Sequence, residues 1–268
     1  MLRPWLKLFR VVNLPTVPGD VLVGAALAMW CCGGSASASA QDMARIALAA
    51  VSSCLLYMFG LVDNDIVGAA TDNGRPIPDG QISMRAARIA RMLGLLLGVA
   101  ASASAACFVV DGAAFGVEYA VMFAICQIAA ALALVAAIVA YNRTKRPLLM
   151  GLCRGLNVLL GVSSVLPSLL WLRLFLRAPL QSCAVAVVAA VWTVYIAAVT
   201  KYSEGEESDP ERRRSVGRLI GGIVYLQLVV LIVLAIANPY VNPLLLAGAV
   251  LLVVLRVFRR AFPKVSAS

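Results

Sequence analysis

Eight long apolar segments limit what this chain can fold into. Short polar loops separate them, and they cover residues 16–34, 42–62, 84–110, 115–140, 148–171, 179–200, 216–237 and 241–258. An apolar run of about 20 residues has the length of a helix that crosses a bilayer, and nothing alternates with the period of two that a membrane β-barrel strand needs. We therefore expect an all-α fold: a polytopic transmembrane helical bundle of about eight spans that forms one domain over residues 1–268.

The composition agrees with a membrane protein, and the charges give it an orientation. The 268 residues are 62% hydrophobic and 13% charged, whereas a soluble domain is about half apolar and a quarter charged. The net charge of +10 could indicate nucleic-acid binding, but 20 of the 23 Lys and Arg residues gather on one side of the predicted bundle, the side that holds the N-terminal segment and every second loop. Loops rich in Lys and Arg stay on the cytoplasmic side of a membrane. We expect an integral protein of a bacterial inner (plasma) membrane, in contact with membrane lipid, with both termini cytoplasmic and no nucleic-acid partner.

Two residue types exclude common chemistries. The chain has no histidine, so metalloprotease, haem-ligand and Ser/His/Asp sites lack their usual ligand or base. The seven cysteines are scattered through apolar segments without C-x-x-C spacing, and we interpret them as small buried hydrophobic residues. The first residues are basic, but Pro15, Pro18 and Asp20 interrupt the apolar run that follows them, and no typical small-residue cleavage site follows closely. We expect a retained first helix and not a cleaved signal peptide.

A polar stretch follows the second apolar segment. Residues 63–83 read DNDIVGAATDNGRPIPDGQIS and hold four of the 13 acidic residues, Asp63, Asp65, Asp72 and Asp79. Crowded carboxylates repel one another unless a metal ion or a cluster of basic groups lies close by. If the helix continued, Asp65 and Asp72 would share one face, since they are seven residues apart. The Arg-Pro-Ile-Pro run at 75–78 predicts an extended segment, and Ser83 predicts the N-cap of the next helix.

Other polar residues fall on the same side of the predicted bundle. They include a basic loop, YNRTKRP at 141–147, and a second acidic loop, SEGEESDPERRR at 203–214. Each also has a plain explanation, because topology by itself produces basic loops and charge runs are usually solvated. Asp20 and Arg154 lie inside apolar segments, where a charge is costly unless it faces the bundle interior, water or an ionic partner. Asp20 could instead lie at headgroup level as an interfacial cap, and Asn157 shares one helix face with Arg154.

Together these loops suit a particular ligand. Mg²⁺ can bridge carboxylates to the oxygens of a pyrophosphate ester while Arg and Lys neutralise its remaining charge, and an apolar bundle suits a hydrocarbon tail. Asn64-Asp65-x6-Asp72 with the downstream R-P-I-P-x-G (75–80) resembles the first aspartate motif of the UbiA superfamily of intramembrane prenyltransferases. That motif reads N-D-x-x-D-x-x-x-D, with R-P-I-P-x-G downstream. The resemblance extends over nearly the whole chain: Asn13 looks like the family's N-terminal Asn, and residues 141–145 look like its Y-x-x-x-K segment.

The resemblance implies an enzyme that transfers an isoprenyl chain from a prenyl diphosphate to a small or aromatic acceptor, with Mg²⁺ as cofactor. The candidate catalytic residues are Asp65, Asp72 and Lys145. The candidate substrate-binding residues are Asn13, Asp20, Asn64, Arg75, Tyr141, Arg154 and Asn157. The candidate metal ligands are Asp65, Asp72, Glu204, Glu207 and Asp209.

Three features depart from the family pattern. Gly68 stands where the motif has its middle Asp, the second loop lacks a clean D-x-x-x-D, and we count eight segments where the family usually has nine. The chain thus resembles the divergent UbiA-like members of bacterial ebo-type biosynthetic clusters. One alternative is a degenerate UbiA-like protein that binds or moves a lipid-like precursor without catalysis. Another is a CDP-alcohol phosphotransferase, but neither Asp79-Gly80 nor Asp111-Gly112 continues as the D-G-x-x-A-R that it needs.

Overall fold

A helix occupies each of the eight predicted apolar segments. The computed structural model describes residues 2–32, 39–70, 74–108, 112–166, 179–205 and 209–261. Its helices are α1 (Leu2–Leu8), α2 (Thr16–Cys31), α3 (Ala40–Val67), α4 (Met84–Ser104), α5 (Gly112–Thr144), α6 (Pro147–Ser163), α8 (Pro179–Ser203), α9 (Pro210–Ala237) and α10 (Asn242–Ala261), with 3-10 turns η1 (Ala105–Phe108) and η2 (Pro239–Val241). The all-α fold class is confirmed.

Six helices in the described part of the chain are long and apolar enough to cross a membrane: α3, α4 with η1, α5, α8, α9 and α10. Helices α2 and α6 are apolar but shorter, with 16 and 17 residues. Helix α6 ends at Ser163 and a turn follows, before the end of the predicted segment 148–171, whose residues 167–171 lie outside the described part of the chain. The hydroxyls of Ser163 and Ser164 donate to carbonyls of the preceding turn, and such bonds compete with helix continuation.

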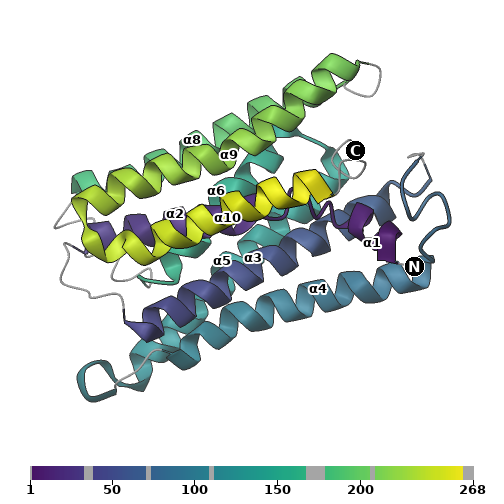
Figure 1. Ribbon diagram of the computed structural model, residues 1–268. Coiled ribbons are helices and arrows are strands. Elements are labelled where there is room, and N and C mark those ends of the chain that lie inside the picture. Colours follow the sequence, from purple (N-terminus) through teal and green to yellow (C-terminus); the bar gives the residue numbers. More distant parts are fainter. Residues whose placement is uncertain are drawn as a thin grey trace.

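The helices run back and forth along one direction, so the chain passes repeatedly between the two ends of the bundle (Figure 1). Helix α1, the C-terminal end of α10 and the connections α3–α4, α5–α6 and α8–α9 all lie at one end. We call this the polar end, because the 63–83 stretch and both loops singled out in the sequence belong to it. Helix α2 packs against α3, α6, α8, α9 and α10, and all its residues except Pro18 and Trp30 are buried. It is the central helix.

Glycines let α2, α6 and α8 pack backbone against backbone. A Cβ atom on Gly24 of α2 would lie 1.9 Å from the Val158 carbonyl oxygen, and one on Gly161 of α6 would lie 2.1 Å from that of Val21. A Cβ on Gly151 of α6 would lie 2.0 Å from the Thr193 carbonyl oxygen of α8. Small residues allow such close approach between apolar helices. The three helices thus form a rigid support for the polar side chains that they carry.

The 63–83 stretch differs from its predicted local structure in two ways. Helix α3 ends at Val67 with Gly68 as its C-cap, so it does not continue to Asp72, which lies outside the described residues. Residues 75–78 form a turn and not an extended segment: the Asp79 N–H donates to the Arg75 carbonyl at 2.9 Å. The fixed φ of proline suits a turn as well as an extended chain. The predicted cap is confirmed, since the Ser83 side chain accepts from the Ala86 N–H.

Candidate functional site

The last turn of α3 presents three consecutive polar residues to three different neighbours. The first, Asp63, is held by α4 and α5: Arg91 Nη1 lies 3.1 Å from Asp63 Oδ1, and Asn142 Nδ2 donates to Asp63 Oδ2 at 2.9 Å. Asn142 also donates to the Gly60 carbonyl at 3.0 Å. Asp63 and Asn142 are buried. This acid therefore anchors the end of α3 between two helices.

The next two residues face cations from two loops. Asp65 is buried and forms an ion pair with Arg75, with 3.0 Å between Oδ1 and Nη1. Asn64 Oδ1 accepts a hydrogen bond from Lys145 Nζ. The 74–83 loop reaches this position because Ile77 and Ile82 pack with Leu8 of α1, and Lys7 Nζ donates to the Gly74 carbonyl at 2.7 Å. The structure thus brings together Asn64, Asp65, Arg75 and Lys145.

Lys145 adopts a backbone conformation that favours glycine. It follows α5 with φ +54°, and its N–H donates to the Tyr141 carbonyl at 2.7 Å. Glycine or asparagine usually occupies this left-handed position after a helix, and another L-residue there costs about 1–2 kcal/mol. The Lys145 ammonium lies 5.9 Å from the centre of the Tyr141 ring. The strained residue is therefore the one whose side chain reaches the α3 motif.

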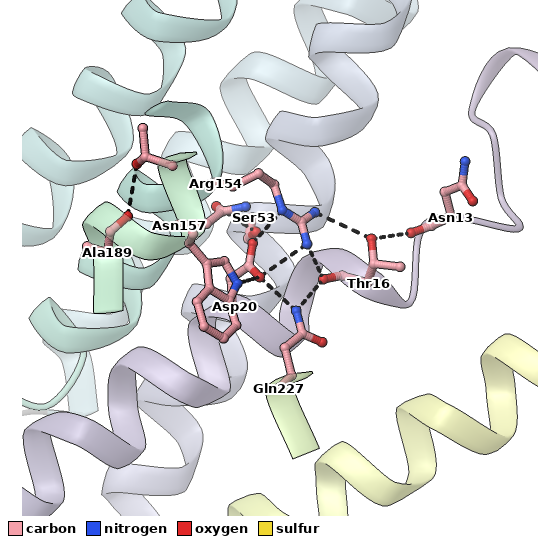
Figure 2. A network of polar contacts seen from close by, with 10 residues as sticks. Asn13, Thr16, Asp20, Ser53, Arg154, Asn157, Ala189 and Gln227 are labelled. Carbon is pink, nitrogen blue, oxygen red and sulfur yellow. Dashed lines mark hydrogen bonds and ion pairs between the residues drawn. The ribbon is translucent and has the colours of Figure 1, made fainter. Parts of the chain in front are cut away.

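A second polar group lies inside the bundle, centred on Asp20 of α2 (Figure 2). The Asp20 carboxylate is fully buried and meets Arg154 of α6, with 2.7 Å between Oδ2 and Nε and 3.1 Å between Oδ1 and Nη2. Trp192 Nε1 of α8 and Gln227 Nε2 of α9 donate to the same Oδ1 at 2.9 and 2.7 Å. Asp20 is therefore not an exposed interfacial cap. A buried charge pair needs such additional donors to offset its desolvation.

The network extends towards the start of α2. The Thr16 carbonyl accepts from Arg154 Nη2 at 2.7 Å and from Gln227 Nε2 at 2.9 Å. The Thr16 hydroxyl donates to the Asn13 carbonyl at 2.8 Å, as Figure 2 shows. On the other side, Ser53 of α3 donates to Asn157 Oδ1 at 2.8 Å.

Four predicted substrate-binding residues thus lie in or beside one interior network, and not at the α3 motif: Asn13, Asp20, Arg154 and Asn157. Sequence reasoning did not identify Thr16, Ser53, Trp192 and Gln227 as their partners. The sequence could have indicated Gln227, because a polar amide within an apolar segment needs hydrogen-bond partners in the bundle interior.

The second acidic loop has a local role in the described residues. Asp209 caps α9, since its carboxylate accepts from the N–H groups of Glu211 and Arg212 at 3.0 and 3.1 Å. Glu204 is exposed, and its carbonyl accepts from Arg212 Nη1 at 2.8 Å. Glu207 lies outside the described residues. The metal-binding role expected for this loop stays a prediction.

The oxygen donors at the end of α3 suit Mg²⁺, which prefers carboxylate, amide carbonyl and water oxygens. Asp65 supplies a carboxylate and Asn64 an amide oxygen on the same helical turn. Within residues 2–261, leaving out the gaps named above, no group of three or more Cys, Asp or Glu side chains is arranged to hold a metal ion. Two of the predicted metal ligands, Asp72 and Glu207, lie outside the described residues, so the predicted Mg²⁺ site stays a prediction.

Comparison with known proteins shows which solved structures share the fold of this chain. No protein-family model and no curated protein sequence matches the chain. Among solved structures, a digeranylgeranylglyceryl phosphate synthase matches with a TM-score of 0.50 and 15% identity, over 99% of this chain and 97% of that one. A UbiA homologue from Archaeoglobus fulgidus bound to GPP and Mg²⁺ matches with a TM-score of 0.50 and 15% identity, over 97% of this chain and 87% of that one. The same homologue bound to DMAPP and Mg²⁺ gives 0.50 and 16%, over 96% and 87%. Over nearly its whole length, the chain has a UbiA-like helical fold.

Proposed function

We propose that this protein is an intramembrane prenyltransferase that moves an isoprenyl chain from a prenyl diphosphate to a small or aromatic acceptor. One observation carries the proposal: the Asn64-Asp65 turn of α3 meets Arg75 from one loop and Lys145 from another at the polar end. The fold supports it, because the similar Archaeoglobus fulgidus homologue was solved with prenyl diphosphates and Mg²⁺. We further propose that the polar end is cytoplasmic.

The residues of the α3 turn and the two loop cations have distinct parts in the proposed reaction. Mg²⁺, held by Asp65 and Asp72 with support from Asn64, would supply positive charge to the diphosphate. Arg75 and Lys145 donate hydrogen bonds to the departing pyrophosphate, which takes the electron pair of the breaking carbon–oxygen bond. The acceptor then bonds to the allylic carbon and releases a proton. The apolar helices beneath surround the isoprenyl chain.

Arg154 fits this scheme as a supporting residue. We expected it to bind substrate, but Asp20 lies against its guanidinium and neutralises its charge. The Arg154–Asp20 pair is buried inside the bundle, whereas the side chain of Arg75 keeps 29% of its surface exposed, so Arg75 and not Arg154 is the guanidinium we assign to the diphosphate. We propose that Arg154 instead holds the start of α2 in place through the Thr16 carbonyl.

Pyrophosphate release tests the proposal. Purified protein should release pyrophosphate from farnesyl diphosphate in the presence of Mg²⁺ and an aromatic acceptor, and Asp65→Ala and Asp72→Ala should abolish the release. Glu118→Gln is the matched control, because Glu118 is an exposed acid on α5 away from the α3 motif. Failure of the unmodified protein to bind farnesyl diphosphate, with or without Mg²⁺, would refute the function.

A binding protein without catalysis is the second candidate, and Gly68 favours it. This residue stands where the family motif has its middle Asp, yet its φ of −82° does not require glycine. The backbone therefore leaves an aspartate possible at this position. Gly68→Asp should alter the Mg²⁺ dependence of pyrophosphate release in an enzyme, whereas in a binding protein it should leave release absent.

A further inference from the structure

Two strained basic residues mark the polar end. Within the described residues, Arg10 (φ +42°) and Lys145 (φ +54°) are the non-glycine residues with positive φ. Such strain persists only where the surrounding structure enforces it, and it collects at functional sites. Lys145 already belongs to the candidate site. Arg10 takes part in none of the contacts described for that site, so its strain needs a separate explanation.

The backbone on both sides of Arg10 is held tightly. Its N–H donates to the Lys7 carbonyl at 3.1 Å, and its carbonyl accepts from the Asn13 N–H at 2.8 Å. Leu8 and Val12 are both buried. A glycine at position 10 would form the same two backbone hydrogen bonds without strain. The presence of an arginine must therefore be explained by what its side chain does.

Arg10 follows directly on a segment that packs beside the candidate site, because Leu8 packs with Val62 of α3 and Ile77 of the 74–83 loop, and Lys7 Nζ donates to the Gly74 carbonyl. The Arg10 guanidinium lies within electrostatic range of the phenol groups of Tyr57 on α3 and Tyr141 on α5. Arg75 is also within range of Tyr141, and Lys145 lies over the Tyr141 ring. Cations from three separate segments therefore act on one tyrosine, and one of them, Lys145, also bonds to Asn64 of the α3 turn.

Arg10 differs from its neighbours in having no partner for its charge. Arg75 pairs with Asp65 and Arg154 with Asp20. In the part of the chain that the structure describes, the Arg10 guanidinium forms no hydrogen bond or ion pair with another residue. It is only partly exposed. A guanidinium has five N–H donors in a planar fork that matches phosphate oxygens.

We propose that Arg10 is a substrate-binding residue that donates to a phosphate oxygen of the prenyl diphosphate. This assignment rests on the proposed function and adds to it a cation from the N-terminal segment. It accounts for both unusual properties of Arg10: the strain is retained because an arginine is needed at this position, and the ligand supplies the missing acceptor.

Arg10→Gly separates binding from folding. Purified variants are titrated calorimetrically with inorganic pyrophosphate and Mg²⁺ in neutral detergent, and tryptophan fluorescence gives the thermal midpoint. Loss of a hydrogen bond to a charged group should weaken pyrophosphate binding about 10–100-fold. The thermal midpoint should be unchanged or higher, since glycine accepts a positive φ. Arg3→Gln is the matched control because Arg3 is an exposed cation on α1, and its pyrophosphate affinity should equal that of the unmodified protein.

The other outcomes overturn the assignment in distinguishable ways. If the unmodified protein binds neither pyrophosphate nor farnesyl diphosphate, the proposed function itself fails. If it binds pyrophosphate and Arg10→Gly binds equally well, only the role of Arg10 fails. A thermal midpoint several degrees lower in Arg10→Gly would show that the side chain serves the fold. Anionic lipid headgroups offer the same oxygens, so retention of phosphatidylglycerol is measured too. If Arg10→Gly loses the lipid but keeps pyrophosphate binding, Arg10 is a lipid contact.

Discussion

Asp20→Ala should be among the most destabilising substitutions in the chain. It removes the carboxylate that meets Arg154, Trp192 and Gln227, and leaves the Arg154 charge buried without its partner. Removing one member of a buried ion pair costs roughly 3–5 kcal/mol. At about 2–4 °C per kcal/mol for a chain of this size, the thermal midpoint should fall by roughly 6–20 °C.

The assay is a double-mutant cycle in detergent-solubilised protein, with tryptophan fluorescence as the readout. Arg154→Met removes the positive charge, so the double variant Asp20→Ala/Arg154→Met contains no uncompensated buried charge. It should be more stable than Asp20→Ala alone. Glu118→Gln, an exposed acid, should leave the midpoint unchanged. The reasoning is refuted if Asp20→Ala has the same thermal midpoint as the unmodified protein. It is also refuted if the stability losses of the two single substitutions simply add in the double variant.

Two further substitutions test the packing and the α3 anchor. Gly161→Ala should prevent folding, because its Cβ would lie 2.1 Å from the Val21 carbonyl oxygen, whereas Gly217→Ala, with nothing within 4 Å, should be neutral or stabilise α9 by up to about 1 kcal/mol. For both variants, the measurement is the fraction of protein that elutes as a monodisperse peak in size-exclusion chromatography. Asn142→Ala removes a donor to the buried Asp63 and should lower the unfolding free energy by roughly 1–3 kcal/mol. An unchanged thermal midpoint would show that Arg91 is sufficient to hold Asp63.

Much of the architecture follows from sequence pattern alone. In lipid every backbone polar group must bond within its own segment, so apolar runs of about 20 residues become helices. The helix at each predicted position reflects that constraint. The distribution of Lys and Arg likewise grouped the loops that the structure places at one end of the bundle.

Local structure within the polar stretch was less predictable. Ser83 was recognisable as a cap because the bond is formed within three residues. The turn at 75–78 was not, because proline is compatible with both turns and extended chain. There the outcome depends on long-range contacts, such as the packing of Ile77 against Leu8 of α1.

The sequence by itself determined that this is an all-α membrane bundle, and it identified Asn64, Asp65, Arg75 and Lys145 as candidates for one site. Only the tertiary structure decided which polar groups meet. Asp20 and Arg154 are 134 positions apart, and Asp20 and Gln227 are 207 apart. Their pairing depends on how α2, α6 and α9 are rotated about their axes, and interhelical packing sets that rotation.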